Sequence, residues 1–347
     1  MPGRPTCGVG ILPASMTYDV HAHCIPGAFR DWLATRGPAA GVEIVEAGGG
    51  SCVRFGGRVT TGPQFGMAAI TERGRRLAEM DRMGIEVQVL AGWVDLTGYE
   101  LGRDTAGEYA RAHNEALAAE ASEGNGRFRS LGTAPLQFPD LAVKTLDHAM
   151  SDLGMHGVQI ATTVEDRFLD EVPGMDDFWQ AAQDLGAFVL LHPMRPLAGV
   201  DLSRYLMDNA VGRPAESSVA LAGLIFSGVL ERHPGLRICV VHGGGFLPYQ
   251  IGRLDKAFQA RPDLAGARIS RPPSEYLRMT YADTVVHDPL ALAHLVAVMG
   301  SDRVLVGTDY PFPMGDQDPL RLIESTPGLS AADVAAIATG NARAIFG

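Results

Sequence analysis

Residues 236–245 read LRICVVHGGG, and this stretch decides the architecture. Its first six residues are mostly apolar and rich in β-branched side chains, as buried parallel strands are. A histidine, His242, follows at the end of the run, and three glycines then lead into a helical pattern at 246–261. The stretch therefore predicts one strand–turn–helix unit with a polar residue at the exit of its strand.

The same unit recurs along the whole chain. Strands are predicted at 17–21, 85–91, 129–134, 157–161, 187–191, 236–241, 277–282 and 303–307. Helical patterns lie at 71–83, 106–123, 139–153, 175–185, 215–232, 246–261, 289–299 and 331–346. Strands that alternate with helices in this way predict an α/β fold, a (β/α)₈ barrel of the TIM type, as a single domain over 1–347. A doubly wound open sheet is the alternative, but its GxGxxG turn is not found.

One segment, 26–70, breaks this rhythm. It has many glycines and no clear helix, while 42–45 and 51–59 have the pattern of small strands. We interpret the segment as an insertion after the first strand that folds over the barrel mouth as a lid, with a floppy loop as the alternative. Residues 1–15 lack the apolar region of a signal peptide and are expected to be a disordered extension.

Composition excludes several classes of function. The formal net charge of −11 over 347 residues argues against a nucleic-acid partner, because no basic stripe can neutralise phosphates. No apolar run approaches the roughly 20 residues that a membrane helix needs. The cysteines form no CxxC pair and predict neither a disulfide framework nor a zinc knuckle, which fits a reducing cytoplasm; they are Cys7, Cys24, Cys52 and Cys239.

Metal-type side chains stand at the exits of four predicted strands. His21 and His23 follow the first strand, and their two-residue spacing places both imidazoles on one face. His192, His242 and Asp309 follow the fifth, sixth and eighth strands. Because the carboxyl ends of barrel strands meet at one face, these residues predict a shared metal centre.

The natural ligand set is His21, His23, His192 and Asp309. Three imidazoles and a carboxylate suit a divalent ion, most of all Zn²⁺, although manganese and iron also fit. A bound metal lowers the pKa of its water toward about 7. His242 is then free for proton transfer, and Asp309 or a metal-bound water is the alternative group that delivers the proton. The strand at 157–161 ends without a lysine to bridge a second ion, so we predict one metal per chain.

With these residues in place, the chain resembles the amidohydrolase superfamily. Within it, the chain resembles the branch of aminocarboxymuconate semialdehyde decarboxylase and related aromatic-acid decarboxylases. The likeness runs from Asp19 to the terminal 340–346 and is densest from 214 to 313. The motifs are PAES at 214–217, FSG at 226–228, HGGG at 242–245, GR at 252–253, RPPSEY at 271–276 and GTDYPFP at 307–313.

The resemblance implies a mononuclear zinc site made by the same four ligands, with His242 activating water or shuttling protons. It also implies a homodimer in which Arg253 and Arg261 reach a carboxylate in the partner's site. If the resemblance is set aside, the two arginines are equally consistent with the ordinary solvent-exposed face of a helix. No organic cofactor is expected.

The chain departs from this family at two substrate-binding positions. A threonine aligns where the insertion of the family carries an arginine, and Arg58 or Arg54 is a candidate substitute. After the fifth strand, Arg195 stands where the family has an aromatic residue and an acid, and its planar fork is suited to a carboxylate. Trp93 and Phe312 are candidates for the pocket wall. Among the remaining histidines we keep only His287, which follows the seventh predicted strand, as open.

The predicted activity is metal-dependent, non-oxidative decarboxylation of a small unsaturated or aromatic carboxylic acid. The alternative is a hydrolase or hydratase that attacks an amide, a lactone or an activated C–C bond at the same site. A metal-binding protein without turnover is the third hypothesis, and a complete ligand set beside a spare histidine argues against it. Release of CO₂, as opposed to uptake of water, separates the first two.

Overall fold

The computed structural model describes residues 17–60, 64–195 and 199–347, and its centre is a closed barrel of parallel strands. The barrel strands are β1 (Tyr18–Cys24), β5 (Val87–Gly92), β6 (Phe128–Ser130), β7 (Gly157–Ala161), β10 (Phe188–His192), β11 (Arg237–Val240), β12 (Tyr281–Asp283) and β13 (Val304–Leu305). They run β1-β5-β6 in one sheet and β13-β12-β11-β10-β7 in the other. The two sheets are joined on both sides. One junction is a parallel β-bridge between Gly132 and Val158, and the other is a hydrogen bond of 2.8 Å from the backbone N–H of Val20 to the carbonyl oxygen of Val306. The predicted (β/α)₈ barrel is confirmed.

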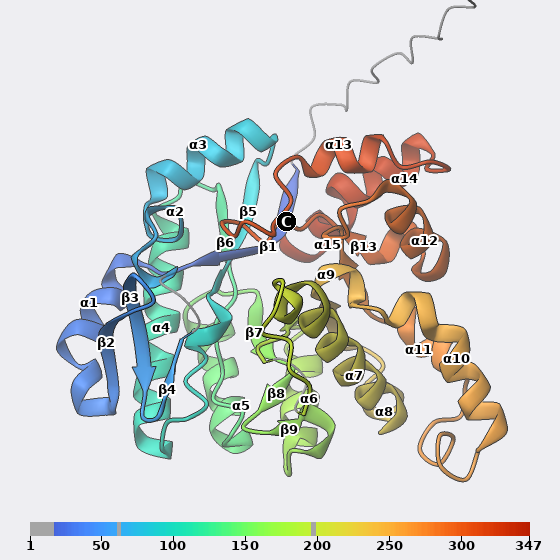
Figure 1. Cartoon of the computed structure of the whole chain (residues 1–347), viewed down its shortest axis with the longest axis horizontal. Helices are drawn as coiled ribbons and strands as arrows, with labels where there is room; N and C mark the ends of the chain where they lie inside the picture. Colours follow the sequence, from blue (N-terminus) through green and yellow to red (C-terminus); the bar gives the residue numbers. More distant parts are fainter. Residues whose placement is uncertain (1–16, 61–63, 196–198) are drawn as a thin grey trace, which may run out of the picture.

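Helices surround the strands on the outside (Figure 1). Those between β1 and β10 are α1 (Gly27–Thr35), α2 (Ala68–Thr71), α3 (Arg73–Met83), α4 (Arg103–Ser122), α5 (Pro139–Asp147) and α6 (Met175–Asp184). Those after β10 are α7 (Arg213–Phe226), α8 (Val229–Arg232), α9 (Val241–Gly244), α10 (Leu247–Ala260), α11 (Pro273–Leu277), α12 (Pro289–Met299), α13 (Pro319–Glu324), α14 (Ala331–Ala335) and α15 (Asn341–Phe346). Within the described ranges, none of the helices is both long and apolar enough to cross a membrane.

Short helical turns extend or link these elements. The 3₁₀ turns are η1 (Gly37–Ala40), η2 (Gln64–Gly66), η3 (Val94–Leu96), η5 (Leu169–Glu171) and η7 (Ser301–Arg303). The π-type turns are η4 (His148–Asp152), η6 (Asp208–Gly212) and η8 (Ala336–Gly340). Because η4 continues α5 and η8 joins α14 to α15, two predicted helices are each built from successive pieces.

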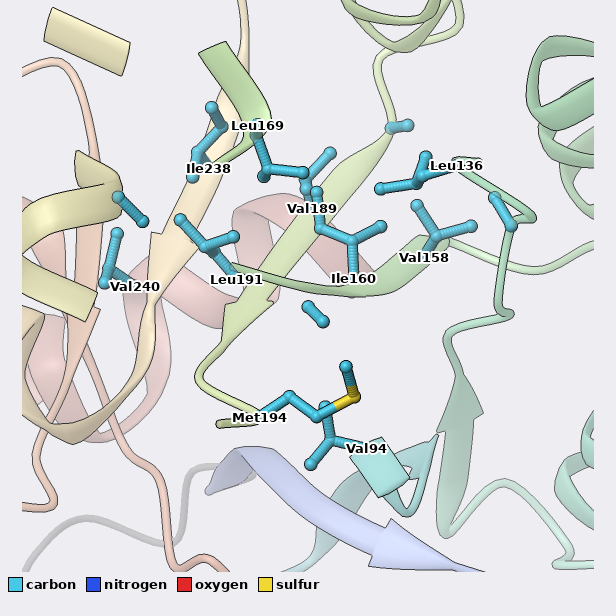
Figure 2. Close-up of a cluster of buried hydrophobic side chains, with 14 of the residues drawn as sticks. Val94, Leu136, Val158, Ile160, Leu169, Val189, Leu191, Met194, Ile238 and Val240 are labelled. Atoms are coloured by element: carbon cyan, nitrogen blue, oxygen red, sulfur yellow. The ribbon is translucent and has the colours of Figure 1, made fainter. Parts of the chain in front are cut away.

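Alternating side chains of the strands build two apolar layers. Phe188 and Leu190 of β10 face the barrel interior with Tyr18 and Val20 of β1. The intervening side chains face the helices, and Figure 2 shows them gathered on β7, β10 and β11 as Val158, Ile160, Val189, Leu191, Ile238 and Val240. Both layers are buried, which is why these strands read as continuous apolar runs rather than as alternating patterns.

The insertion contains strands at both predicted places, although 51–59 is divided between two strands, and it contains α1 and the short α2, which the sequence does not predict within 26–70. A small antiparallel sheet is made of β2 (Val42–Ala47), β3 (Gly50–Phe55) and β4 (Arg58–Val59). Outside the insertion, β8 (Thr163–Val164) and β9 (Arg167–Phe168) form a separate hairpin after β7. The absence of a helix was a wrong prediction, because α1 spans nine residues. Only Phe29 and Leu33 of α1 are buried, so its pattern is short, and contact of Phe29 with His113 of α4 stabilises it. The predicted extension at 1–15 lies outside the described residues.

Candidate metal centre

All five predicted strand-exit residues meet at the mouth of the barrel. His21 and His23 come from β1, His192 ends β10, His242 follows β11, and Asp309 follows β13. Oδ1 of Asp309 lies 3.0 Å from Nε2 of His23 and 3.3 Å from Nε2 of His21. Nε2 of His242 lies 3.7 Å from Oδ2 of Asp309, and the rings of His23 and His192 are 5.0 Å apart.

An irregularity in β1 turns both of its histidines toward this centre. Tyr18 and Val20 pack in the barrel interior, so strict alternation would direct His21 and His23 to the opposite side. The register with β5 shifts between Asp19 and Ala22, and this shift reverses the alternation. The pairing of the two imidazoles on one face was predicted from spacing, but the irregularity that aims them was not.

Three imidazoles are held with one nitrogen facing the centre. The Nδ1 atom of each ring forms a hydrogen bond with a fixed acceptor. The acceptor of His21 is Oδ2 of Asp283 at 2.6 Å. The acceptors of His23 and His192 are the carbonyl oxygens of Gly92 at 3.2 Å and of Pro193 at 2.7 Å. With a metal ion bound, these acceptors would hold the proton on Nδ1 and leave the lone pair of Nε2 for the ion. Nε2 of His21 and of His192 is buried without a hydrogen-bond partner among the described residues. Such orphaned nitrogens are what a metal ion satisfies.

The charges of the cluster also favour a cation at its middle. Burial works to lower the pKa of His21, yet the carboxylates of Asp309 and Asp283 raise it to about 10. Burial opposes ionisation of Asp309, but the imidazoles of His21 and His23 hold its pKa well below the usual range. Burial and the neighbouring imidazoles keep the pKa of His192 well below its ordinary value. The nitrogen and oxygen donors present therefore fit a divalent ion such as zinc or manganese.

The geometry brings five donors together where the prediction used four as ligands. Donor atoms of His21, His192, His242 and Asp309 all lie within 4.8 Å of one another, and His23 contacts Asp309 directly. His23 and His242 differ in the hydrogen bonding of their rings. Nδ1 of His23 has an acceptor, whereas Nδ1 of His242 has none among the described residues.

Asp283 is a member of the site that the sequence analysis missed. It ends β12, and its second oxygen, Oδ1, accepts from the backbone N–H groups of Gly243 and Val285 at 2.8 and 3.1 Å. One carboxylate thus orients both the His21 ring and the loop that carries His242. The available signal was its position, since it stands at a strand exit like the residues that were found.

Replacing Asp283 with asparagine should weaken metal binding by about 10- to 100-fold. An amide nitrogen would donate to Nδ1 of His21, move the imidazole proton to Nε2 and block the nitrogen that faces the centre. Metal titration against a competing chelator measures this effect. The control is Asp288→Asn, because Asp288 caps α12 from the same loop and asparagine caps equally well. Equal metal affinity in both variants would contradict the role given to Asp283.

The loop that carries His242 depends on glycine at one position above all. Gly245 has φ of +69° and ψ of −137°, and a Cβ there would lie 2.3 Å from the Pro214 carbonyl oxygen. His242 itself adopts φ of +57°. The close approach of this loop to α7 holds His242 beside Asp309.

Gly245→Ala should therefore destabilise the protein by about 2–4 kcal/mol, through backbone strain and the clash with Pro214. Gly74→Ala is the matched control, because Gly74 lies in α3 with nothing within 4 Å of its added Cβ. That control should raise stability by up to about 1 kcal/mol. Chemical unfolding measures both, and an unchanged midpoint for Gly245→Ala would refute the constraint.

Two adjoining cavities open beside the centre and share His242 and Asp309 in their walls. The first, of about 240 Å³, is also lined by Trp93, Phe312, Val94, Leu206, Arg213 and Met314. The second, of about 210 Å³, lies toward Phe246, Tyr249 and His287. The ring centroids of Trp93 and Phe312 are 6.5 Å apart, so the two aromatic candidates form adjacent walls of the first cavity.

The structure does not bring Arg195 to the centre. Its guanidinium bonds to Glu100 at 3.0 Å and to Asp166 at 3.4 Å, in a separate cavity of about 390 Å³. Arg58 pairs with the same Glu100, and Arg54 pairs with Glu43 in the insertion. Opposite charges close to each guanidinium hold these three arginines away from the centre.

Neither of the two arginines predicted to cross a dimer lies at this centre. Arg253 is exposed on α10, and Arg261 follows α10 and pairs with Asp263 at the surface. Their reach toward a partner chain stays a prediction. The interpretation of 26–70 as a lid also stays a prediction, and no described residue of that segment lines either cavity.

Most other histidines are structural. His113 is buried against Phe29, with ring centroids 4.0 Å apart, and burial lowers the pKa of His113 to about 3. His148 pairs with Asp152 at the surface. His287 differs from these histidines, because it lines the second cavity. Its backbone adopts a positive φ of +58°.

The fold and the cluster together define a barrel enzyme of the metal-binding class. A family model described as amidohydrolase matches residues 18–347. The chain is 36% identical over 272 residues to a 2-amino-3-carboxymuconate-6-semialdehyde decarboxylase of Dictyostelium discoideum, covering 78% of this chain and 76% of the relative. The chain belongs to the amidohydrolase family, in the branch of this decarboxylase.

Solved structures show the same fold. The 5-carboxyvanillate decarboxylase of Sphingomonas paucimobilis superposes with a TM-score of 0.78 at 24% identity, over 96% of this chain and 99% of that one. A dihydroxybenzoic acid decarboxylase of Polaromonas, solved with bound manganese and 2-nitroresorcinol, gives 0.73 at 22% identity, over 96% and 97%. The curated relatives, rather than these structures, confirm the predicted class, a metal-dependent, non-oxidative decarboxylase and hence a carboxy-lyase.

Proposed function

We propose that His21, His23, His192 and Asp309 hold one divalent ion, and that His242 is the proton-transfer group for loss of CO₂ from a conjugated or aromatic acid. The observation that carries this assignment is the difference in hydrogen bonding at Nδ1 among the four histidines. His21, His23 and His192 each give their Nδ1 proton to a fixed acceptor, as metal-bound histidines usually do. His242 has no such acceptor among the described residues and lines both cavities.

The residues around the first cavity supply the remaining steps. A bound divalent ion supplies Lewis acidity to an oxygen of the substrate. Trp93 and Phe312 offer faces to a planar ring, and their apolar surfaces exclude water. His242 delivers a proton from Nε2 to the carbon that carries the carboxylate. The C–C bond then breaks, CO₂ leaves, and its electron pair restores the conjugated system.

Zinc is the ion that we propose, with manganese as the alternative. Three imidazoles and a carboxylate are a typical zinc donor set. The manganese bound in the Polaromonas decarboxylase supports the alternative. We propose a reducing cytoplasm as the compartment, which the small number of cysteines supports.

A homodimer is also part of the proposal. Phe246 and Tyr249 are 42% and 46% exposed at the start of α10, the helix that carries Arg253, and both line the second cavity. Apolar side chains exposed beside a site favour coverage by a second copy. Light scattering of the purified protein tests this state, and a monomer at micromolar concentration would exclude a site completed by Arg253.

The test of the activity is CO₂ release from a panel of aromatic and muconate-type acids by the metal-loaded protein. CO₂ from any member, together with the matching protonated product, supports the decarboxylase. Hydrolysis of a lactone or amide panel without CO₂ would move the chain to the hydrolase alternative.

A further inference from the structure

Arg213 lines the metal-centre cavity and forms no ion pair among the described residues. It begins α7 and is half-buried, in a wall that it shares with His192, His242 and Asp309. Its Nη1 donates to the Pro193 carbonyl at 2.8 Å. Among the described residues no carboxylate lies within ion-pair distance of Arg213, whereas Arg58 and Arg195 both pair with Glu100. Burial raises the pKa of Glu216, one turn further along α7, to about 7, and the charge of Arg213 works to lower it. The Glu216 oxygens are already held, because they accept from Thr162 and from the backbone N–H of Arg195.

The rest of the first cavity is mostly apolar around this guanidinium. Trp93, Val94, Leu206, Phe312, Pro313 and Met314 provide its surface. A cation in such surroundings is costly unless an anion or strong acceptors meet its free N–H groups. One edge of the guanidinium is fixed by Pro193, and the remaining donors are available for a bidentate contact.

We propose that Arg213 binds a second anionic group of the substrate, so that the preferred substrates are planar conjugated acids with two carboxylates. This inference rests on the proposed function, since it assigns the first carboxylate to the reacting end at the metal centre. The aromatic walls hold the plane of the substrate, and Arg213 fixes its far end. Arg213 thereby determines which acid the enzyme accepts. Arg195 is not available for this role, because it pairs with Glu100 and Asp166.

The test is calorimetric binding of two probes, isophthalate and benzoate, to the full-length, metal-loaded protein. Isophthalate carries the second carboxylate and benzoate does not, so the wild type should bind isophthalate more tightly. Arg213→Met should weaken isophthalate about 10- to 100-fold, as expected for a lost charge-assisted contact, and change benzoate less than about twofold. Arg213→Lys should recover part of the loss, because it keeps the charge without the fork. Arg195→Met should leave the preference for isophthalate intact.

Several results would overturn the inference. Equal weakening of both probes by Arg213→Met would mean that Arg213 does not read a second group. Loss of metal from that variant would make Arg213 a positioning residue that acts through Pro193 and His192. Loss of the preference in Arg195→Met would assign it to the wrong arginine. CO₂ release is measured separately. A wild type that releases CO₂ but does not prefer isophthalate over benzoate refutes this inference alone. A preference for isophthalate that is lost in Arg213→Met, without CO₂ release from any acid, refutes the decarboxylase alone.

Discussion

Removal of the metal should abolish CO₂ release, lowering the rate by about three orders of magnitude or more. A Lewis acid supplies several kcal/mol of transition-state stabilisation, and about 1.4 kcal/mol corresponds to a factor of ten. Without the ion, Nε2 of His21 and of His192 would also be buried without a partner, so the melting temperature should fall. Dialysis against a chelator, metal analysis, CO₂ release and thermal unfolding together measure the effect.

Reconstitution then identifies the ion. Stoichiometric Zn²⁺ should restore activity and melting temperature, whereas Mg²⁺ should restore neither, because imidazole nitrogens suit transition ions and Mg²⁺ prefers oxygen ligands. Recovery with Mn²⁺ alone would replace zinc in the proposal. Full activity in protein shown by analysis to be free of metal would contradict the proposed centre.

Replacing His242 with asparagine should lower the rate of CO₂ release by about 10²- to 10⁴-fold, the usual contribution of a general acid or base. Metal content should stay at one ion per chain, because the proposed ligands are unchanged. Single-turnover kinetics and metal analysis on the same sample separate these two effects. His148→Asn is the matched control, since His148 pairs with Asp152 at the surface.

The companion variant His23→Asn tests the choice between the two histidines. It should lose metal, because Nε2 of His23 is one of the proposed ligand atoms. If His242→Asn instead loses the ion and His23→Asn retains it, the two roles are reversed. That outcome is chemically reasonable, since both imidazoles contact Asp309.

Much of the architecture and the centre could be predicted because strand exits carry a strong local signal. Apolar runs that end in a polar residue, such as 187–192 and 236–242, mark buried parallel strands, and the barrel geometry places all their exits at one mouth. The five polar residues did meet there. The helix α1 was missed because its buried face is only Phe29 and Leu33, and packing against α4 stabilises it.

The substrate side of the site was harder to predict, because it depends on where long side chains find partners. Arg195 follows β10 directly and looks suited to a carboxylate, but Glu100 and Asp166 hold its guanidinium elsewhere. Arg213 stands in the loop-to-helix junction before the PAES motif and gave no signal until the fold placed it in the cavity. Pairings between residues far apart in sequence decide such orientations, and a single sequence does not display them.

The sequence by itself determined the barrel, the metal-type residues at the strand exits and the family. Each of these follows from local pattern and from motifs of a few residues. Tertiary structure decided which nitrogen of each histidine faces the centre, because the acceptors are Asp283, Gly92 and Pro193 from other strand exits and from the residue after His192. It also decided which arginine lies beside the metal centre without an ion pair among the described residues. Both depend on burial and on opposite charges brought together by folding, which is the physical reason that sequence spacing could not supply them.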